Sequence, residues 1–149
     1  MTATLRHMFS RLVSALIAEG EKEKALKALD YCMDVIPSKS VPHTYVCAVL
    51  ASQYLQLANA ESDPGKKAEI KEKGEVILNE MLENSLQYLN WFSTSLTPNQ
   101  LRSATADFAQ HLGIFSEILQ IAQNFDNEEL VEANYPEFMK YSQIYNSLR

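Results

Sequence analysis

Residues that interrupt regular structure are scarce in this sequence. Only 4 glycines and 5 prolines occur among its 149 residues, which argues against a many-turned β-protein and against long loops rich in glycine and proline. No apolar run approaches the roughly 18 residues that a membrane-spanning helix needs, and the first seven residues lack the apolar stretch of a secretory signal. Taken as a complete chain, the sequence is therefore expected to be cytoplasmic.

Positive charge and cysteine are also limited. The formal net charge is −6, whereas a nucleic-acid-binding surface requires a stripe of lysine and arginine that meets phosphates. We therefore expect no nucleic-acid partner and no docking on an anionic membrane. Cys32 and Cys47 are too few for a zinc site or a disulfide framework. Each lies in an apolar helical pattern and is interpreted as a small buried residue, with a disulfide between neighbouring helices as the alternative.

Sequence motifs for catalysis are missing. His7, His43 and His111 lie far apart, without a partner at helical metal-ligand spacing. The sequence has neither a Gly-x-Ser-x-Gly motif nor a glycine-rich phosphate loop. The sequence thus predicts no catalytic residue, no metal and no cofactor, and a protein that is not an enzyme. One mixed-sign group is interpreted as an exposed helix face with i,i+4 ion pairs: Lys66, Lys67, Glu69, Glu72 and Lys73.

The apolar residues recur with a helical period along most of the chain. This spacing predicts about six helices: roughly 4–18, 21–35, one from Pro42, one from Pro64 towards Leu89, one from Pro98, and 128–147. Gly20 is expected to stop the first helix. Asp63, Thr97 and the pair Asp126-Asn127 are expected to cap helix starts. Pro136 should break or kink the last helix, because proline lacks an N–H and clashes with the preceding turn.

Short turns between successive helices favour antiparallel packing. The predicted fold is all-α, one helical-repeat domain with hairpins at about 4–37, 42–92 and 97–148. The tetratricopeptide pattern is matched by the first hairpin, and by the second with about eleven inserted residues, but not by the third. We therefore predict a tetratricopeptide-like right-handed stack. The residues expected to pack its repeats are Phe9, Leu12, Leu16, Ala25, Leu29, Cys32, Pro37, Leu50, Ala51 and Tyr54.

The only tryptophan lies in an aromatic run that contains Tyr88, Trp91 and Phe92. These rings either fill a hairpin core or form a patch for a protein partner, since Trp and Tyr are enriched at binding hot spots. Burial of Tyr88 and Trp91 would favour the first interpretation, and exposed rings without core partners would favour the second. A further aromatic group is expected to cover the last hairpin: Tyr135, Phe138, Tyr141 and Tyr145.

The first 37 residues resemble a known family. The family pattern reads Phe-x-Arg-Leu-x-x-Ala-Leu-x-x-Glu-Gly, then a turn of mixed charge, then Leu-Asp-x-Cys-Met-x-x-x-Pro. It is matched here by Phe9, Arg11, Leu12, Ala15, Leu16, Glu19, Gly20, Leu29, Asp30, Cys32, Met33 and Pro37. The segments around Val41 to Tyr45 and Leu86 to Leu96 are similar more loosely. The chain thereby resembles the C-terminal soluble, tetratricopeptide-like region of bacterial protein O-mannosyltransferase-like multi-pass membrane proteins, long catalogued as a domain of unknown function.

The resemblance implies that the chain is a fragment of a membrane protein that takes a sugar from a lipid carrier. The reaction site would lie in the missing membrane part, and no catalytic residue carries over to this segment. The resemblance also implies a location on the periplasmic side of the inner membrane. The segment would be associated with the membrane only through the rest of the parent membrane protein. Our leading hypothesis is a non-catalytic accessory domain that binds a protein or positions an acceptor polypeptide. The alternative is a purely structural or dimerising cap of the parent, so the oligomeric state stays open.

Overall fold

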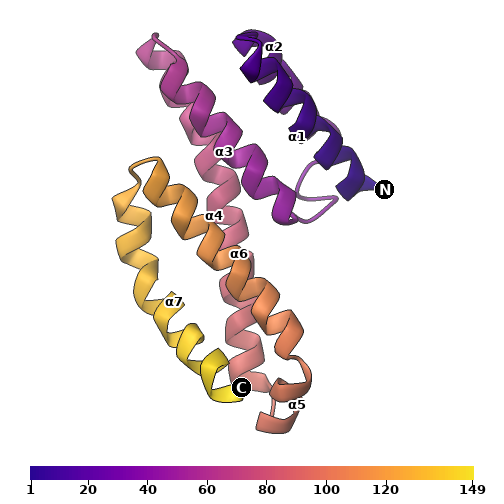
Figure 1. Cartoon of the computed structure of the whole chain (residues 1–149), viewed down its shortest axis with the longest axis vertical. Helices are drawn as coiled ribbons and strands as arrows, with labels where there is room; N and C mark the ends of the chain where they lie inside the picture. Colours follow the sequence, from indigo (N-terminus) through magenta and orange to yellow (C-terminus); the bar gives the residue numbers. More distant parts are fainter. The chain divides into compact units, whose positions relative to one another are not determined.

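The computed structural model describes residues 1–149 and contains helices and no strands. Its helices are α1 (Thr2–Ala18), α2 (Lys22–Val35), α3 (Tyr45–Ala60), α4 (Pro64–Ser95), α5 (Pro98–Ser103), α6 (Thr105–Asn124) and α7 (Glu128–Leu148) (Figure 1). The predicted all-α fold is confirmed, and its arrangement as a tetratricopeptide-like stack stays a prediction. None of these helices combines the length and the apolar character needed to cross a membrane.

The helix count differs from the prediction because the fifth predicted helix is divided. The expected capping box forms at its start, where Thr97 Oγ1 accepts from the Gln100 N–H and Gln100 Oε1 accepts from the Thr97 N–H. This helix, α5, then ends at Ser103 with Ala104 as its C-cap, and α6 begins with Thr105. The Thr105 hydroxyl donates to the carbonyl oxygen of Arg102 at 2.6 Å. This local side-chain bond lies at the interruption, where it competes with helical backbone bonds.

Two further expectations differ from the structure, namely the start of the third helix and a break at Pro136, while a kink at Pro136 stays a prediction. The third helix begins at Tyr45 rather than at Pro42, because the carbonyl oxygen of Pro42 accepts a hydrogen bond from the Arg6 side chain in a loop. Pro136 does not break α7, which continues to Leu148. Pro136 and Glu132 are both exposed, so the Glu132 carbonyl that loses its helical donor can be hydrated instead.

The chain forms two compact units, Met1–Asn79 and Glu80–Arg149, and the boundary between them falls within α4. In the first unit, α1 packs against both α2 and α3 (Figure 1). Gly20 has a φ of 78° in the turn from α1 to α2, a conformation that glycine adopts without a steric cost. The helices α3 and α4 also approach closely, since a Cβ at Gly74 would lie 3.0 Å from the Ala51 carbonyl oxygen.

The core of the first unit contains most of the residues predicted to pack the repeats. Six of them are fully or almost fully buried: Ala25, Leu29, Cys32, Leu50, Ala51 and Tyr54. Phe9, Leu16 and Pro37 are half-buried, and Leu12 is 48% exposed, so its assignment to the core is wrong. The buried residues of α1 are instead Arg6, Ser10 and Val13. On this side of α1, Gln53 of α3 donates to the Ser10 carbonyl and to the Ser14 hydroxyl, both at 2.9 Å.

The second unit has an aromatic core between α6 and α7. Phe108 and Phe115 of α6 are completely buried. Phe115 meets Phe138 edge to face at a centroid distance of 5.4 Å, and Phe108 lies 6.4 Å from Tyr141 and 6.3 Å from Tyr145. The expectation that these three rings of α7 cover the last hairpin is therefore confirmed. The fourth ring of the group, at Tyr135, is 51% exposed.

Candidate functional site

The aromatic run of α4 is divided between the core and the surface of the second unit. Phe92 is 7% exposed and lies 6.3 Å from Phe108, so it fills the core. Tyr88 and Trp91 are each 51% exposed. Tyr88 stacks on His111 at 4.4 Å, and Trp91 meets Phe92 edge on at 5.2 Å. The two exposed rings thus combine a free face with a packed face, which neither of the two interpretations anticipated.

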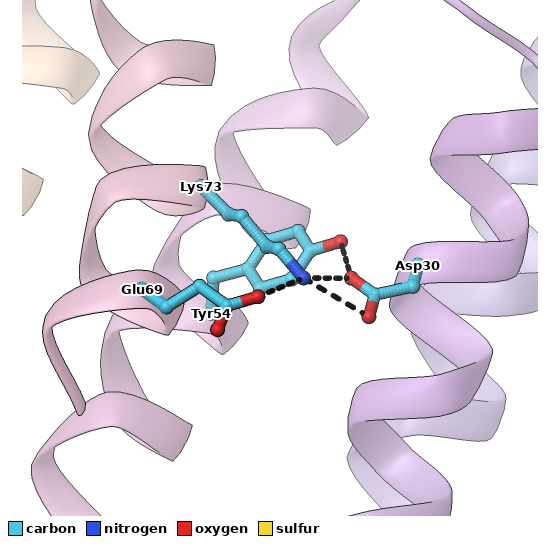
Figure 2. Close-up of polar contacts among 4 residues, drawn as sticks. All are labelled: Asp30, Tyr54, Glu69 and Lys73. Atoms are coloured by element: carbon cyan, nitrogen blue, oxygen red, sulfur yellow. Dashed lines mark hydrogen bonds and ion pairs between the residues drawn. The ribbon is translucent and has the colours of Figure 1, made fainter. Parts of the chain in front are cut away.

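A polar network joins three helices of the first unit (Figure 2). The Tyr54 hydroxyl of α3 donates to Asp30 Oδ1 of α2 at 2.7 Å. The Lys73 ammonium of α4 donates to both carboxylate oxygens of Asp30 at 3.2 Å, and it lies 3.6 Å from Glu69. Burial, and secondarily the Asp30 carboxylate, raises the pKa of Tyr54. Tyr54 therefore stays a neutral donor at physiological pH, and Asp30 connects α2 with both α3 and α4.

This network lies at the edge of an open groove between α2 and the first part of α4. The groove has a volume of about 420 Å³, within the range of roughly 300–1,000 Å³ found for binding pockets. Its lining carries charges of both signs around two apolar side chains: Glu23, Leu26, Lys27, Asp30, Glu61, Lys66, Glu69, Ile70 and Lys73. We call it the α2–α4 groove. It can offer ion pairs to both signs of charge and a small apolar contact.

The ionisable groups around the groove are partly paired with one another and partly exposed. Lys73 is engaged by Asp30 and Glu69, whereas Lys27 and Lys66 are exposed at the groove. Histidine and cysteine are absent from the lining, and no group of three His, Cys, Asp or Glu residues in the chain could hold a metal ion. The charged side chains that are present offer charge pairing and hydrogen bonding.

A second polar feature, the fully buried Arg6, stabilises the loop between α2 and α3. Its guanidinium donates to three carbonyl oxygens, from Nη2 to Ile36 at 3.0 Å and to Val41 at 2.8 Å, and from Nη1 to Pro42 at 2.8 Å. The acceptor at Ile36 lies at the C-terminus of α2, where carbonyl groups lack helical partners and a cation is favourable. Arg6 is therefore a structural cation, placed to bind backbone carbonyls.

The two cysteines also belong to the core of the first unit. Cys32 and Cys47 are free thiols with no exposed surface, which confirms their interpretation as small buried residues. Burial raises the pKa of both thiols, and the positive charge of Arg6 lowers it in part. Both thiols therefore stay protonated at neutral pH.

Sequence reasoning placed Lys73 on an exposed face and found no role for Asp30 beyond the family pattern. The ion pair of Lys73 with Glu69 was anticipated from their i,i+4 spacing, but its closer partner Asp30 lies 43 residues away in the sequence. Arg6 was missed as well. A usable signal was its position in line with Ser10 and Val13, at intervals of four and three residues, which places it on the same face of α1 as a core residue.

Comparison with known proteins adds no family. No family model, no curated protein and no solved structure matches the chain. The resemblance to the C-terminal region of the protein O-mannosyltransferase-like membrane proteins consequently stays a prediction.

Proposed function

We propose that the chain is a non-catalytic helical interaction domain that binds an extended polypeptide in the α2–α4 groove. The observation that carries this proposal is the lining of the groove, which combines four carboxylates and three lysines with the apolar side chains of Leu26 and Ile70. A polypeptide segment with both acidic and basic side chains can complement such a surface. Charges on the rim would guide its association and its orientation, with the apolar pair as an anchor.

The dimensions of the groove suit a short extended segment. The α2 residues that line it run from Glu23 to Asp30, a rise of about 10 Å at roughly 1.5 Å per residue. An extended chain advances about 3.3 Å per residue, so about three residues of a ligand would lie along this wall. The peptide would place a basic side chain near Glu23 or Glu61 and an acidic side chain near Lys66.

The biological setting is part of the same proposal and rests on the resemblance of the first 37 residues. In this setting, the domain belongs to a membrane protein of the glycosyltransferase type and lies on the periplasmic side of the inner membrane. There it presents an acceptor polypeptide or a protein partner to the membrane part of that protein. The domain itself supplies binding and no reaction step. The ionic character of the groove would allow release of the polypeptide after the reaction, because exposed ion pairs are weak and screened by salt.

The test selects peptides from a displayed random library with the purified chain and measures their affinity by fluorescence polarisation. Enriched peptides should carry both charge signs, and Lys66→Glu should weaken their binding about tenfold or more. Lys140→Glu is the matched control, because Lys140 is an exposed lysine of α7 outside the groove. The proposal is wrong if no peptide is enriched, or if Lys66→Glu binds the selected peptides as tightly as Lys140→Glu does.

Trp91 gives a separate readout in the same experiment. Its ring is half-exposed and is the only tryptophan of the chain. A ligand confined to the α2–α4 groove should leave its emission unchanged. A peptide that shifts the emission of Trp91 and tolerates Lys66→Glu would move the binding site to the aromatic run of Tyr88, Trp91 and Phe92.

A further inference from the structure

The hairpin of α1 and α2 exposes five large apolar side chains. On α1, Leu5 is 39%, Met8 is 62% and Leu12 is 48% exposed, and on α2, Tyr31 is 60% and Val35 is 49% exposed. We call these five residues the hairpin face. Its α1 positions recur at intervals of three and four residues, so they form one stripe along the helix. Burial of such an apolar stripe against a partner is favourable, because it removes apolar surface from water.

We propose that the occupant of the hairpin face is a second copy of this chain, bound through a two-fold axis perpendicular to the two helices. Such an isologous contact requires a surface that is complementary to a copy of itself rotated by 180° about the two-fold axis. Each helix of the hairpin would then lie antiparallel to the same helix of the second copy. The sequence of each stripe meets this requirement.

The α1 stripe is symmetric in its side chains. When two α1 helices lie antiparallel with the axis between Met8 and Phe9, Leu5 of one copy faces Leu12 of the other, and Leu12 faces Leu5. The two Met8 side chains meet near the axis. The contact is apolar along its whole length, and the flexible methionine side chain can fill irregular space at its centre.

The α2 stripe is symmetric in its charges. Lys27 and Asp34 are exposed and flank Tyr31 at four and three residues, which is about one helical turn on each side. When two α2 helices lie antiparallel with the axis beside Tyr31, the Asp34 carboxylate of each copy lies beside the Lys27 ammonium of the other. The two ion pairs form at the rim of the apolar contact, where they specify the orientation of the partner.

One observed contact supports a single axis for both helices. The rings of Phe9 and Tyr31 lie 5.8 Å apart across the hairpin, so the centre of the α1 stripe and the centre of the α2 stripe are at the same height. A two-fold axis through that height generates both antiparallel pairs together. The result is a four-helix bundle with antiparallel neighbours, an arrangement common among helical proteins.

The first experiment measures the mass of the chain by sedimentation velocity over a range of concentrations. The mass should rise from 16.9 kDa to twice that value with increasing concentration. Met8→Glu should raise the dissociation constant at least a hundredfold, because it places two carboxylates at the centre of the apolar contact. The control Met139→Glu, at an exposed methionine of α7, should leave the dissociation constant unchanged. A monomer at every concentration, or a dimer that tolerates Met8→Glu, would overturn the proposal.

The second experiment tests the orientation with charge reversals, at low salt. Lys27→Glu alone and Asp34→Lys alone should each weaken self-association about tenfold, because each places like charges together. An equimolar mixture of the two variants should restore association as a heterodimer. In this heterodimer the two substituted side chains face each other with opposite charges, and the unchanged Lys27 of one copy faces the unchanged Asp34 of the other. A mixture that associates no better than either variant would overturn the antiparallel pairing. Met8→Glu and Asp34→Lys change residues outside the α2–α4 groove, so their effect on self-association is independent of peptide binding, whereas Lys27 also lines that groove.

Discussion

Replacement of Arg6 by methionine is the sharpest test of how the first unit is stabilised. Arg6 is fully buried and donates three hydrogen bonds to the loop between α2 and α3. Methionine keeps most of the apolar stem and removes every donor. The perturbation therefore separates the hydrogen bonds of Arg6 from its packing. Arg6→Lys is the intermediate variant, with a charge but without the planar fork of donors.

The magnitude follows from the environment of the three carbonyl groups. The acceptor at Ile36 is buried, so after the substitution it loses its partner at a cost of about 1–3 kcal/mol. The bonds to Val41 and Pro42 are partly buried, and water can replace part of each. The guanidinium no longer has to be desolvated, which offsets some of the loss. We expect Arg6→Met to lower the free energy of unfolding by about 2–4 kcal/mol.

The measurement is urea unfolding, followed by circular dichroism and by the reactivity of the buried thiols of Cys32 and Cys47. The thiols report on the first unit alone, so they show whether that unit is the one destabilised. Arg11→Met, on an exposed residue of the same helix, should change the free energy of unfolding by less than about 0.5 kcal/mol. A free energy for Arg6→Met that equals the Arg11→Met value would refute the assignment of Arg6 as the stabiliser of the loop.

Three further predictions concern single positions. Gly74→Ala should destabilise the chain by about 1–3 kcal/mol, because its Cβ would lie 3.0 Å from the Leu55 side chain. Gly113→Ala should stabilise the chain by about 0.5–1 kcal/mol, because its Cβ meets nothing within 4 Å. Thermal unfolding of the two variants tests both signs. Burial lowers the folded-state pKa of His111, so its contribution to stability is present above the unfolded pKa of about 6.5 and is lost as the pH falls. His111→Gln should therefore reduce the decline in the free energy of unfolding between pH 7.5 and 5. An equal decline in the variant and the original protein contradicts this. Trp91 emission should be intermediate and accessible to acrylamide, since the ring is 51% exposed; an emission maximum typical of a fully buried indole is the contrary result.

Local sequence signals predicted the helices well wherever the deciding interaction is local. The capping box at Thr97 and the turn at Gly20 depend on residues a few positions apart, and both formed as expected. The boundary at Pro42 failed because its backbone carbonyl binds Arg6, which is 36 residues away. The persistence of α7 through Pro136 depends on solvent exposure, which a sequence does not display.

The candidate groove was less predictable than the fold for the same reason. The ion pair of Lys73 with Glu69 could be derived from i,i+4 spacing on one helix. The contacts of Asp30 with Tyr54 and Lys73 depend on how three helices pack. A single sequence gives the periodicity of each helix and leaves the partner of each face open. The groove therefore became visible only with the packed structure.

In the first helix, burial of a cation on one side leaves an apolar stripe exposed on the other side. The apolar residues Leu5 and Leu12 recur with the helical period of Val13, yet the side of α1 that is buried carries Arg6 beside Val13 and leaves Leu5 and Leu12 exposed. The loop carbonyls beside α1 need donors, and the Arg6 guanidinium donates hydrogen bonds to three of them. With Arg6 turned inwards, the opposite stripe of α1 is left in solvent. A second copy of the hairpin would cover this stripe, so the Arg6 contacts and the proposed dimer depend on the same orientation of α1.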